Sequence, residues 1–213
     1  VWIMVAILAV VAAVVLVKVR SRPRVSTPQD AAAAASLVEV LAEGQGAVYH
    51  ATFKTSSPDG SGVLDIWRSG PNFRQRVEAK GEGTLPERTD LVVSGSDVVS
   101  CAQTGDRPWN CTRVPELRDQ LNESIAAPPG KLTGQRVTED TRTIGDVDAR
   151  CFTVDASRAS DEVGGGVSEV CVTGDGIPVR LSSEGSVTEL VALVRTLTPE
   201  DFKPPASPPA SGG

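Results

Sequence analysis

The four cysteines of this 213-residue chain constrain its fold more than any other feature. Cys101 and Cys111 lie symmetrically about a Gly-Asp-Arg-Pro turn signal. Cys151 and Cys171 lie symmetrically about a second polar, turn-forming segment. Runs typical of strands flank each pair, so the pattern predicts two hairpins, each closed by its own disulfide. Because disulfides persist in oxidising compartments, we expect the folded part of the chain outside the cytoplasm.

The pairing itself is not fixed by the sequence, since four cysteines allow three connectivities. Cys101–Cys111 with Cys151–Cys171 is favoured because each bond closes a short local loop, worth roughly 2.5–3.5 kcal/mol in the chain-entropy account. The alternatives are buried free thiols and a zinc site, although no pair has the two-residue spacing typical of zinc ligands.

Residues 1–17 form an unbroken apolar run, VWIMVAILAVVAAVVLV, at the short end of what spans a bilayer as a helix. No small-residue cleavage site follows it and no cysteine ends it, so we expect an uncleaved transmembrane anchor rather than a secretory or lipoprotein signal. A buried helix of a soluble domain is the alternative.

The basic residues after the anchor, Lys18, Arg20, Arg22 and Arg24, oppose an extracytoplasmic domain, because basic flanks ordinarily stay in the cytoplasm. The chain begins with Val rather than Met. A more basic segment upstream of the anchor would favour the opposite orientation, with the C-terminal domain outside the cytoplasm. For the location of the domain, we give more weight to the cysteine pattern than to the basic residues that follow the anchor. We therefore expect a single-pass protein of the cell membrane with its C-terminal domain outside.

Charge argues against two kinds of partner. Residues 1–24 carry four of the 21 basic residues and none of the 27 acidic ones, which leaves 17 basic against 27 acidic residues in the remainder. Nucleic-acid binding rests on phosphate neutralisation, so we expect no nucleic-acid partner. The same acidity disfavours a domain lying flat on an anionic membrane.

Composition divides the chain into four regions. They are the anchor (1–17), a basic linker (18–27), a folded domain (28–202) and a Pro/Ser/Gly tail expected to be disordered (203–213).

The domain is expected to open with a helix and to continue mainly as strands. Thr27 is suited to cap the helix, with Pro28 in the first helical position and Asp30 completing a near capping box. The helix is expected to end near Glu43, before Gly44. A second helix is expected at 115–126. Short alternating runs predict an antiparallel sheet with strands near 47–54, 63–68, 73–78, 90–94, 97–102, 135–143, 148–155, 167–173, 177–183 and 187–196.

Strand parity gives an expectation for the second cysteine pair. Neighbours in a strand point to opposite faces, so Phe152 points away from Cys151 and Val170 points away from Cys171. The disulfide is therefore expected on one face of the sheet and an apolar layer on the other.

The closing part of the sequence carries further motifs. It reads GIPVRLSSEGSVTELVALVRTLTPEDFKPPA, with a G-x-P-x-x-L strand and an acidic-Phe-x-Pro-Pro-Ala ending. The stretch GDVDARCFTVDAS, which leads to VCVTGDGIPVRL, is similar to disulfide-bearing proteins of high-GC Gram-positive bacteria, the actinobacterial group. Together with the order of elements, these motifs resemble the LolA/LppX-like family of lipoprotein carriers and their relatives over about residues 28–206.

This resemblance implies an α+β fold, in which an incompletely closed antiparallel β-barrel and its capping helices surround an apolar cavity. Better-known members of the family bind acyl chains, on lipoproteins or as free lipids. Other relatives act as lipid- or peptide-sensing regulators of membrane-bound anti-sigma factors. The anchor and the missing lipobox depart from the carriers, so free shuttling is not expected.

Inward apolar side chains of such a sheet would contact a bound acyl chain, at about 0.8 kcal/mol per buried CH₂. The same side chains could instead pack a core against the helices. The candidates are Tyr49, Phe53, Leu64, Ile66, Phe73, Val77, Leu91, Val93, Val179, Leu181 and Leu190.

No catalytic constellation is expected. There is no G-x-S-x-G segment, and the single histidine, His50, is expected on the surface. Asp146 and Asp148 predict a turn rather than a cation site, and Trp67 and Trp109 are expected to pack. We therefore expect neither an enzyme nor a cofactor or metal.

Three functions stay open. The leading one is an anchored extracytoplasmic protein that holds an acyl-chain lipid or lipoprotein for transport or presentation. The second is a sensor or regulatory domain that binds a membrane-protein partner through the same fold. The third is a structural envelope domain without a ligand.

Overall fold

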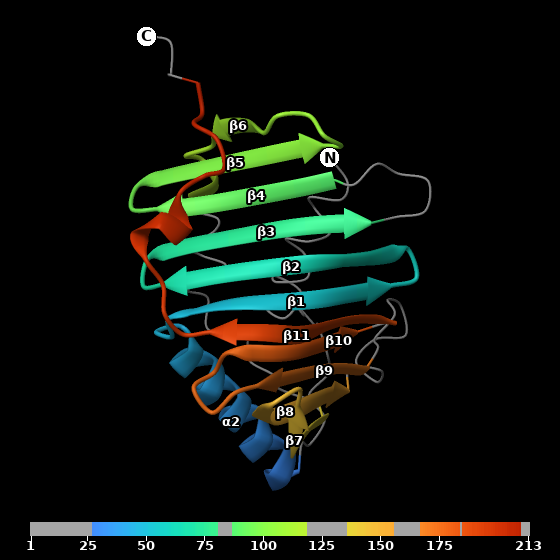
Figure 1. Ribbon diagram of the computed structural model, residues 1–213. Helices are drawn as coiled ribbons and strands as arrows, with labels where there is room; N and C mark the ends of the chain where they lie inside the picture. The colour runs from blue at the N-terminus through green and yellow to red at the C-terminus, as the bar shows by residue number, and fades with distance from the viewer. Residues whose placement is uncertain (1–26, 81–86, 119–135, 156–166, 184, 210–213) are drawn as a thin grey trace.

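A computed structural model describes residues 27–80, 87–118, 136–155, 167–183 and 185–209. These residues form helix α2 (Pro28–Gly44), an eleven-stranded antiparallel sheet and a short 3-10 turn, η1 (Pro199–Phe202) (Figure 1). The strands are β1 (Tyr49–Ser57), β2 (Gly60–Ser69), β3 (Asn72–Lys80), β4 (Glu87–Ser94), β5 (Asp97–Thr104), β6 (Asn110–Arg113), β7 (Arg136–Ile144), β8 (Val147–Asp155), β9 (Val167–Val172), β10 (Pro178–Ser183) and β11 (Ser186–Val194).

The sheet is open, as the family resemblance implies. Its order is β6-β5-β4-β3-β2-β1-β11-β10-β9-β8-β7, with β6 and β7 as the two edges. The first and last strands, β1 and β11, pair at its middle and join a half made by β1–β6 to a half made by β7–β11. Hydrogen bonds between sequence-adjacent strands build each half, so only this one junction unites strands far apart in the chain.

Two of the expected helices fall partly or wholly outside the described residues. The anchor at 1–17 lies outside them, and of the helix expected at 115–126 only residues 115–118 lie inside, where Leu117 and Arg118 are helical. Within the described ranges, no helix combines the length and apolar character needed to cross a bilayer.

Helix α2 begins as its cap signal predicts. The backbone N–H of Asp30 donates to Thr27 Oγ1 at 3.2 Å, and the backbone N–H of Thr27 donates to Asp30 Oδ2 at 3.1 Å. These two bonds satisfy N–H groups that the first helical turn leaves without intrahelical partners. The predicted cap is confirmed, and the helix ends at Gly44.

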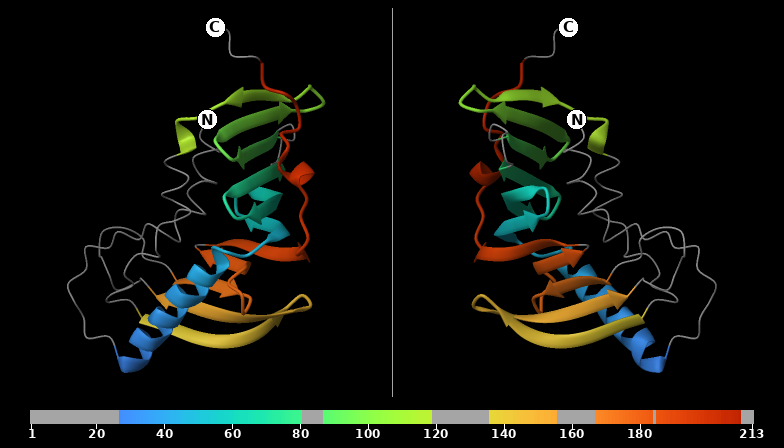
Figure 2. Two further views of the ribbon diagram at one scale, coloured as in Figure 1. Left: turned by 90° about the vertical axis from the view of Figure 1, so that its left-hand side faces the viewer. Right: turned by 90° about the vertical axis from the view of Figure 1, so that its right-hand side faces the viewer.

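Cross-strand register sorts the side chains onto two faces of the sheet. Phe53 lies opposite Leu64, and Leu64 opposite Val77, so all three share the face on which α2 packs; we call it the helix face. Residues 195–209, which we call the strap, leave β11 and run along the opposite face; we call it the strap face. Figure 2 shows α2 and the strap on opposite sides of the sheet.

Under α2, the helix face holds a compact apolar cluster. Leu37 and Val40 of the helix pack against Val137, Phe152 and Val172 of the sheet. Phe152 and Val172 are 0% exposed, and each buried side chain of this size contributes about 1.5–3 kcal/mol. The apolar layer predicted from strand parity is therefore confirmed.

Both predicted disulfides are present. Cys101 pairs with Cys111 and Cys151 with Cys171, and each pair lies directly across two neighbouring strands, with Cα atoms 4.0 Å apart. None of the four cysteines is free, so the thiol and zinc alternatives are wrong.

The C-terminal tail differs from expectation over part of its length. Residues 203–209, assigned to a disordered tail, lie in the strap, and Ala206 packs against the Cys101–Cys111 cluster. The physical reason is that small and Pro residues can lie flat on a sheet without forming a helix or strand. Residues 210–213 lie outside the described part.

The C-terminal end of α2 packs directly on the β9–β10 turn, where Gly44 of the helix lies against Gly176 of the turn. A Cβ placed on Gly44 would lie 2.2 Å from the carbonyl oxygen of Gly176, which itself has a φ of +76°. In an ordinary helix, Gly→Ala stabilises by about 1 kcal/mol. Here we expect Gly44→Ala to destabilise the protein by about 1–3 kcal/mol, because the helix must lift off the turn.

Urea unfolding measures this effect, and Gly174→Ala is the matched control because no atom lies within 4 Å of its added Cβ. A Gly44→Ala variant as stable as the parent protein would contradict this packing of α2.

Candidate functional site

The most elaborate polar arrangement in the described residues lies on the strap face. Two neighbouring cross-strand rows build it. One row runs His50, Trp67 and Arg74 across β1, β2 and β3. The next runs Asp65, Arg76 and Asp90 across β2, β3 and β4, and continues to the Cys101–Cys111 disulfide.

Asp90 is the centre of this site. Its side chain is 0% exposed, and it accepts hydrogen bonds from two guanidinium groups. Arg74 donates from Nε at 3.0 Å and from Nη2 at 2.6 Å. Arg76 donates from Nε at 3.1 Å and from Nη2 at 2.8 Å. Two guanidinium groups around one carboxylate fix its position, and a second carboxylate, that of Asp65, belongs to the residue directly opposite Arg76 on β2.

Aromatic rings surround the two guanidinium groups. Arg74 Cζ lies 4.8 Å from the centroid of Trp67, and Arg76 Cζ lies between Trp67, at 5.8 Å, and Trp109, at 5.9 Å. These are cation–π distances, so the rings further stabilise the two guanidinium groups. The packing roles expected for Trp67 and Trp109 are consistent with these positions.

His50 is more deeply embedded than the sequence predicts. Its ring stacks on Trp67 with centroids 4.3 Å apart, and its Nε2 lies 3.0 Å from Asp65 Oδ1. Thr52 donates to the same carboxylate oxygen at 2.6 Å. His50 and Thr52 thus converge on one oxygen, and Thr52 Oγ1 also lies 3.5 Å from His50 Nε2, so the three side chains hold one another in place.

The strap closes over these rows. Arg74 Nη1 donates to the backbone carbonyl of Asp201 at 2.8 Å, and η1 lies over β3 and β4. Hydrogen bonds from the backbone N–H and the hydroxyl of Thr198 lower the pKa of the Asp201 carboxyl, and the charges of His50 and Arg74 lower it further. Asp201 is therefore held ionised beside a positively charged surface.

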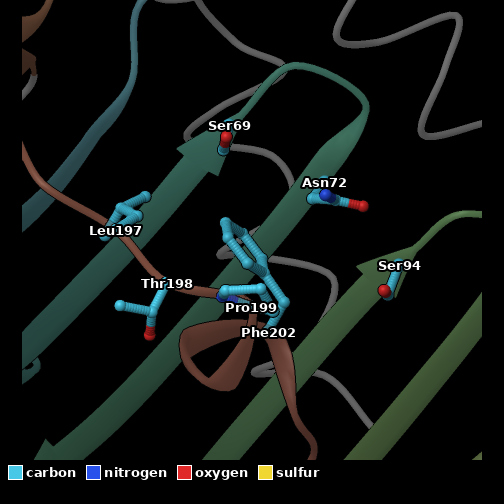
Figure 3. Close-up of a pocket in the computed structure, with 7 residues that line it drawn as sticks. All are labelled: Ser69, Asn72, Ser94, Leu197, Thr198, Pro199 and Phe202. Carbon is cyan, nitrogen blue, oxygen red and sulfur yellow. The ribbon is translucent and has the colours of Figure 1, made fainter.

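A small depression lies where the strap meets the strand ends. Its volume is about 190 Å³, and strap residues line it together with Ser69, Asn72 and Ser94 of the sheet. Figure 3 shows the rings of Phe202 and Pro199 side by side over the strands that carry Asn72 and Ser94. Phe202 is 6% exposed and forms part of the wall of this depression, so its ring anchors the strap to the sheet.

The side chains predicted to line an acyl cavity lie elsewhere and largely contact one another. Tyr49, Phe53 and Leu64 are buried in one helix-face cluster, together with Ile66, Val77 and Leu190. Burial raises the pKa of the Tyr49 hydroxyl. The others fall into three further clusters: Phe73, Leu91 and Val93 near Val98, Leu181 beside Phe152, and Val179 at the Cys151–Cys171 disulfide. None of them lines the depression at the strap.

The segment with Asp146 and Asp148 forms a turn, and potential metal ligands are not grouped in the described residues. Among the described residues, no group of three or more His, Cys, Asp or Glu side chains could hold a metal ion. Asp146 lies in the β7–β8 turn after Gly145, whose φ is +58°, and Asp148 follows in β8, where Thr143 donates to it at 3.0 Å. The predicted turn is thus present.

The sequence analysis missed the site centred on Asp90. A signal was present, because Arg74 and Arg76 alternate with Phe73 and Val77 along one strand. Recognising their partner required the register of β3 on β4, which joins residues 14 and 16 positions apart. The strap carried a second signal, since TPED at 198–201 repeats the T-P-x-D cap of α2.

Comparison with solved structures gives a fold likeness. The chain superposes on the crystal structure of MucB with a TM-score of 0.52, at 15% identity over 82% of this chain and 64% of the MucB chain. A complex of Pseudomonas aeruginosa MucA/MucB gives a TM-score of 0.48, at 15% identity over 80% of this chain and 60% of the matched chain. An uncharacterised conserved protein from Thermus thermophilus gives 0.47, at 13% identity over 82% of this chain and 96% of the matched chain.

These values support likeness of fold alone, and it is the MucB likeness that carries it. No protein-family description matches the sequence, and no curated protein matches it. The chain spans less than two thirds of the MucB chain. The fold of this protein thus resembles that of MucB, in line with the LolA-like sheet that the sequence predicts.

The buried carboxylate gives a first prediction for this site. Asp90→Asn should destabilise the protein by about 3 kcal/mol or more, because it leaves two guanidinium groups, one of them buried, without their counter-charge. Chemical denaturation measures this loss. Asp140→Asn is the control, since Asp140 is 53% exposed and its partner Arg142 keeps Glu169; its expected effect is below about 1 kcal/mol. Equal effects of the two substitutions would contradict a central role for Asp90.

A second prediction concerns the start of the strap, where Arg195 bonds Asp175 of the β9–β10 turn. The bond from Arg195, aided by one from Thr173, lowers the pKa of Asp175 from 3.8 to about 2. A lowered folded pKa means that the pair stabilises the fold above pH 3.8 and that this contribution is lost as the pH falls toward 2. Arg195→Gln should raise the pKa of Asp175 toward its ordinary value.

Carbon-detected NMR titration of the carboxyl group reads this pKa directly. Arg136→Gln, on edge strand β7, should leave it unchanged. An Asp175 titration that is the same with and without Arg195 would show that this ion pair does not form in solution.

Proposed function

We propose that the chain is the extracytoplasmic regulatory domain of an envelope signalling system, anchored by residues 1–17, and that its LolA-like sheet binds a membrane-protein partner. The two disulfides support a location in an oxidising compartment. The proposed role is binding rather than catalysis.

The observation that carries this proposal is the fold likeness to MucB. MucB forms a complex with MucA, in one case with MucA(peri). A protein that contains a fold of this kind can thus bind another protein. Because the chain spans only part of MucB, the extension of a protein-binding role to this chain is our inference.

The packing of the helix face favours the same role over that of a lipid carrier. Phe53 is 2% and Tyr49 5% exposed, and these rings contact neighbouring apolar side chains of the protein itself. Side chains that are already buried against one another expose little apolar surface. An acyl chain could therefore bury little additional surface here, and its binding would gain little free energy.

The second candidate is the holding of an acyl chain on the same helix face. The observation that favours it is a stripe of partly exposed apolar side chains across β2, β3 and β4. It consists of Ile66, Phe73, Val77 and Leu91. A flat stripe of this kind could bind one chain without an enclosed cavity.

Site-specific photo-crosslinking in membranes of a high-GC Gram-positive host separates the two candidates. We would place the crosslinker at three exposed positions, one at a time: Ala102 on the helix face, Arg113 on the strap face and Thr141 on edge strand β7. We expect a defined adduct with one membrane protein from one of the two faces and none from Thr141. The adduct should re-form from the two purified proteins.

Mass spectrometry of an organic extract of the natively purified chain completes the test. The proposal predicts no stoichiometric lipid. A stoichiometric lipid in the absence of any protein adduct would overturn it in favour of the acyl-chain role.

A further inference from the structure

The strap is held on the sheet as a bound peptide would be held. It contacts the rest of the protein at three separate points after leaving β11. Arg195 bonds Asp175 at its start, Phe202 is buried against the sheet at its middle, and Ala206 packs on the Cys101–Cys111 cluster near its end. None of these contacts requires a covalent link to β11, so a segment of another chain could make them equally well.

The middle contact combines shape with backbone recognition. Phe202 is 6% exposed, although it belongs to a turn of only four residues at the surface. Beside it, the buried guanidinium of Arg74 donates to the backbone carbonyl of Asp201 at 2.8 Å. A buried aromatic anchor beside a hydrogen-bonded backbone carbonyl is an arrangement by which a protein surface can bind an extended peptide.

Charge adds a preference for an acidic residue just before the aromatic one. Arg74 is the cation of this cluster that reaches the strap, where it donates to the backbone carbonyl of Asp201. The acidic side chain of Asp201 feels the charges of Arg74 and His50. Guanidinium groups held in place by a buried carboxylate and aromatic rings need no rearrangement to receive such a ligand.

Downstream of the aromatic residue, the strap contains Pro204 and Pro205, both half-buried. Prolines hold a chain extended before it binds, which reduces the entropy lost on binding. Ala206 then packs against the cluster formed by Val99 and the Cys101–Cys111 disulfide.

We propose that the strap face is a docking surface for an extended segment of a protein partner, in which an acidic residue precedes an aromatic residue and prolines follow, and that the strap occupies this surface until such a segment displaces it. This deepens the proposed function and rests on its premise that the partner is a protein. Because the strap is tethered, it competes at a high effective concentration, so the apparent affinity of the partner falls by the fraction of molecules whose surface is open.

The experiment uses the full chain and a fluorescent synthetic peptide of residues 195–209, RTLTPEDFKPPASPP. Phe202→Ala in the protein should loosen its own strap. We therefore expect this variant to bind the probe peptide about tenfold or more tighter than the unaltered chain does. Fluorescence anisotropy gives both dissociation constants, and near-ultraviolet circular dichroism verifies that the variant is folded.

Substitutions in the peptide complete the test, because they cannot unfold the protein. Peptides in which the Phe or the Asp is replaced by Ala should bind at least about fivefold more weakly. If Phe202→Ala does not fold, Ala206→Asp serves instead, since it frees the strap at its far contact.

Equal affinity of the probe for the unaltered chain and the variant would overturn the proposal, as would a peptide that binds equally well without its Phe. Strap exchange between two copies, seen as a concentration-dependent dimer that takes up no probe, would overturn it in favour of self-association. The assay uses no cellular partner, so its failure is distinct from the failure of the crosslinking experiment.

Discussion

One buried carboxylate, that of Asp90, joins the sheet to the strap that crosses it. It accepts hydrogen bonds from Arg74 and Arg76, and Arg74 in turn donates to the backbone of Asp201. An isolated charge at 0% exposure would be costly, and so would the buried guanidinium group of Arg74 without its partner. The Asp90 carboxylate and the guanidinium groups of Arg74 and Arg76 therefore stabilise one another. This dependence fixes their rotamers, the stacking of Trp67 and the path of the chain above them.

Different kinds of interaction stabilise the two faces of the sheet. On the helix face, α2 packs against an apolar cluster, and Gly44 and Gly176 allow the helix to approach the β9–β10 turn closely. On the strap face, short-range charge, aromatic stacking and a disulfide hold an irregular segment. Such a segment is held at a few separate points and can open locally without unfolding the sheet, which is the property expected of a regulatory element.

Local signals in the sequence predict most of the fold. The T-P-x-D cap of α2, the alternating strands and both disulfides follow from patterns within about twenty residues. The pairing of β1 with β11 and the partnership of Arg74 with Asp90 do not, because they depend on which strands meet and in which register. The strap was missed for another reason. Its KPPASPP composition lacks any periodicity, and its order comes from the surface on which Phe202 and Ala206 rest.

Native-state amide hydrogen exchange on the full chain tests the central claim, that the strap is an ordered element able to open separately from the sheet. The informative amides are those of Asp201 and Lys203, which donate to Thr198 and Glu200. We predict that they exchange about 100-fold slower than in an unstructured peptide, yet faster than the amides of β3 and with little dependence on low denaturant concentrations. Exchange at the unstructured rate, or exchange only on global unfolding together with β3, would contradict the account.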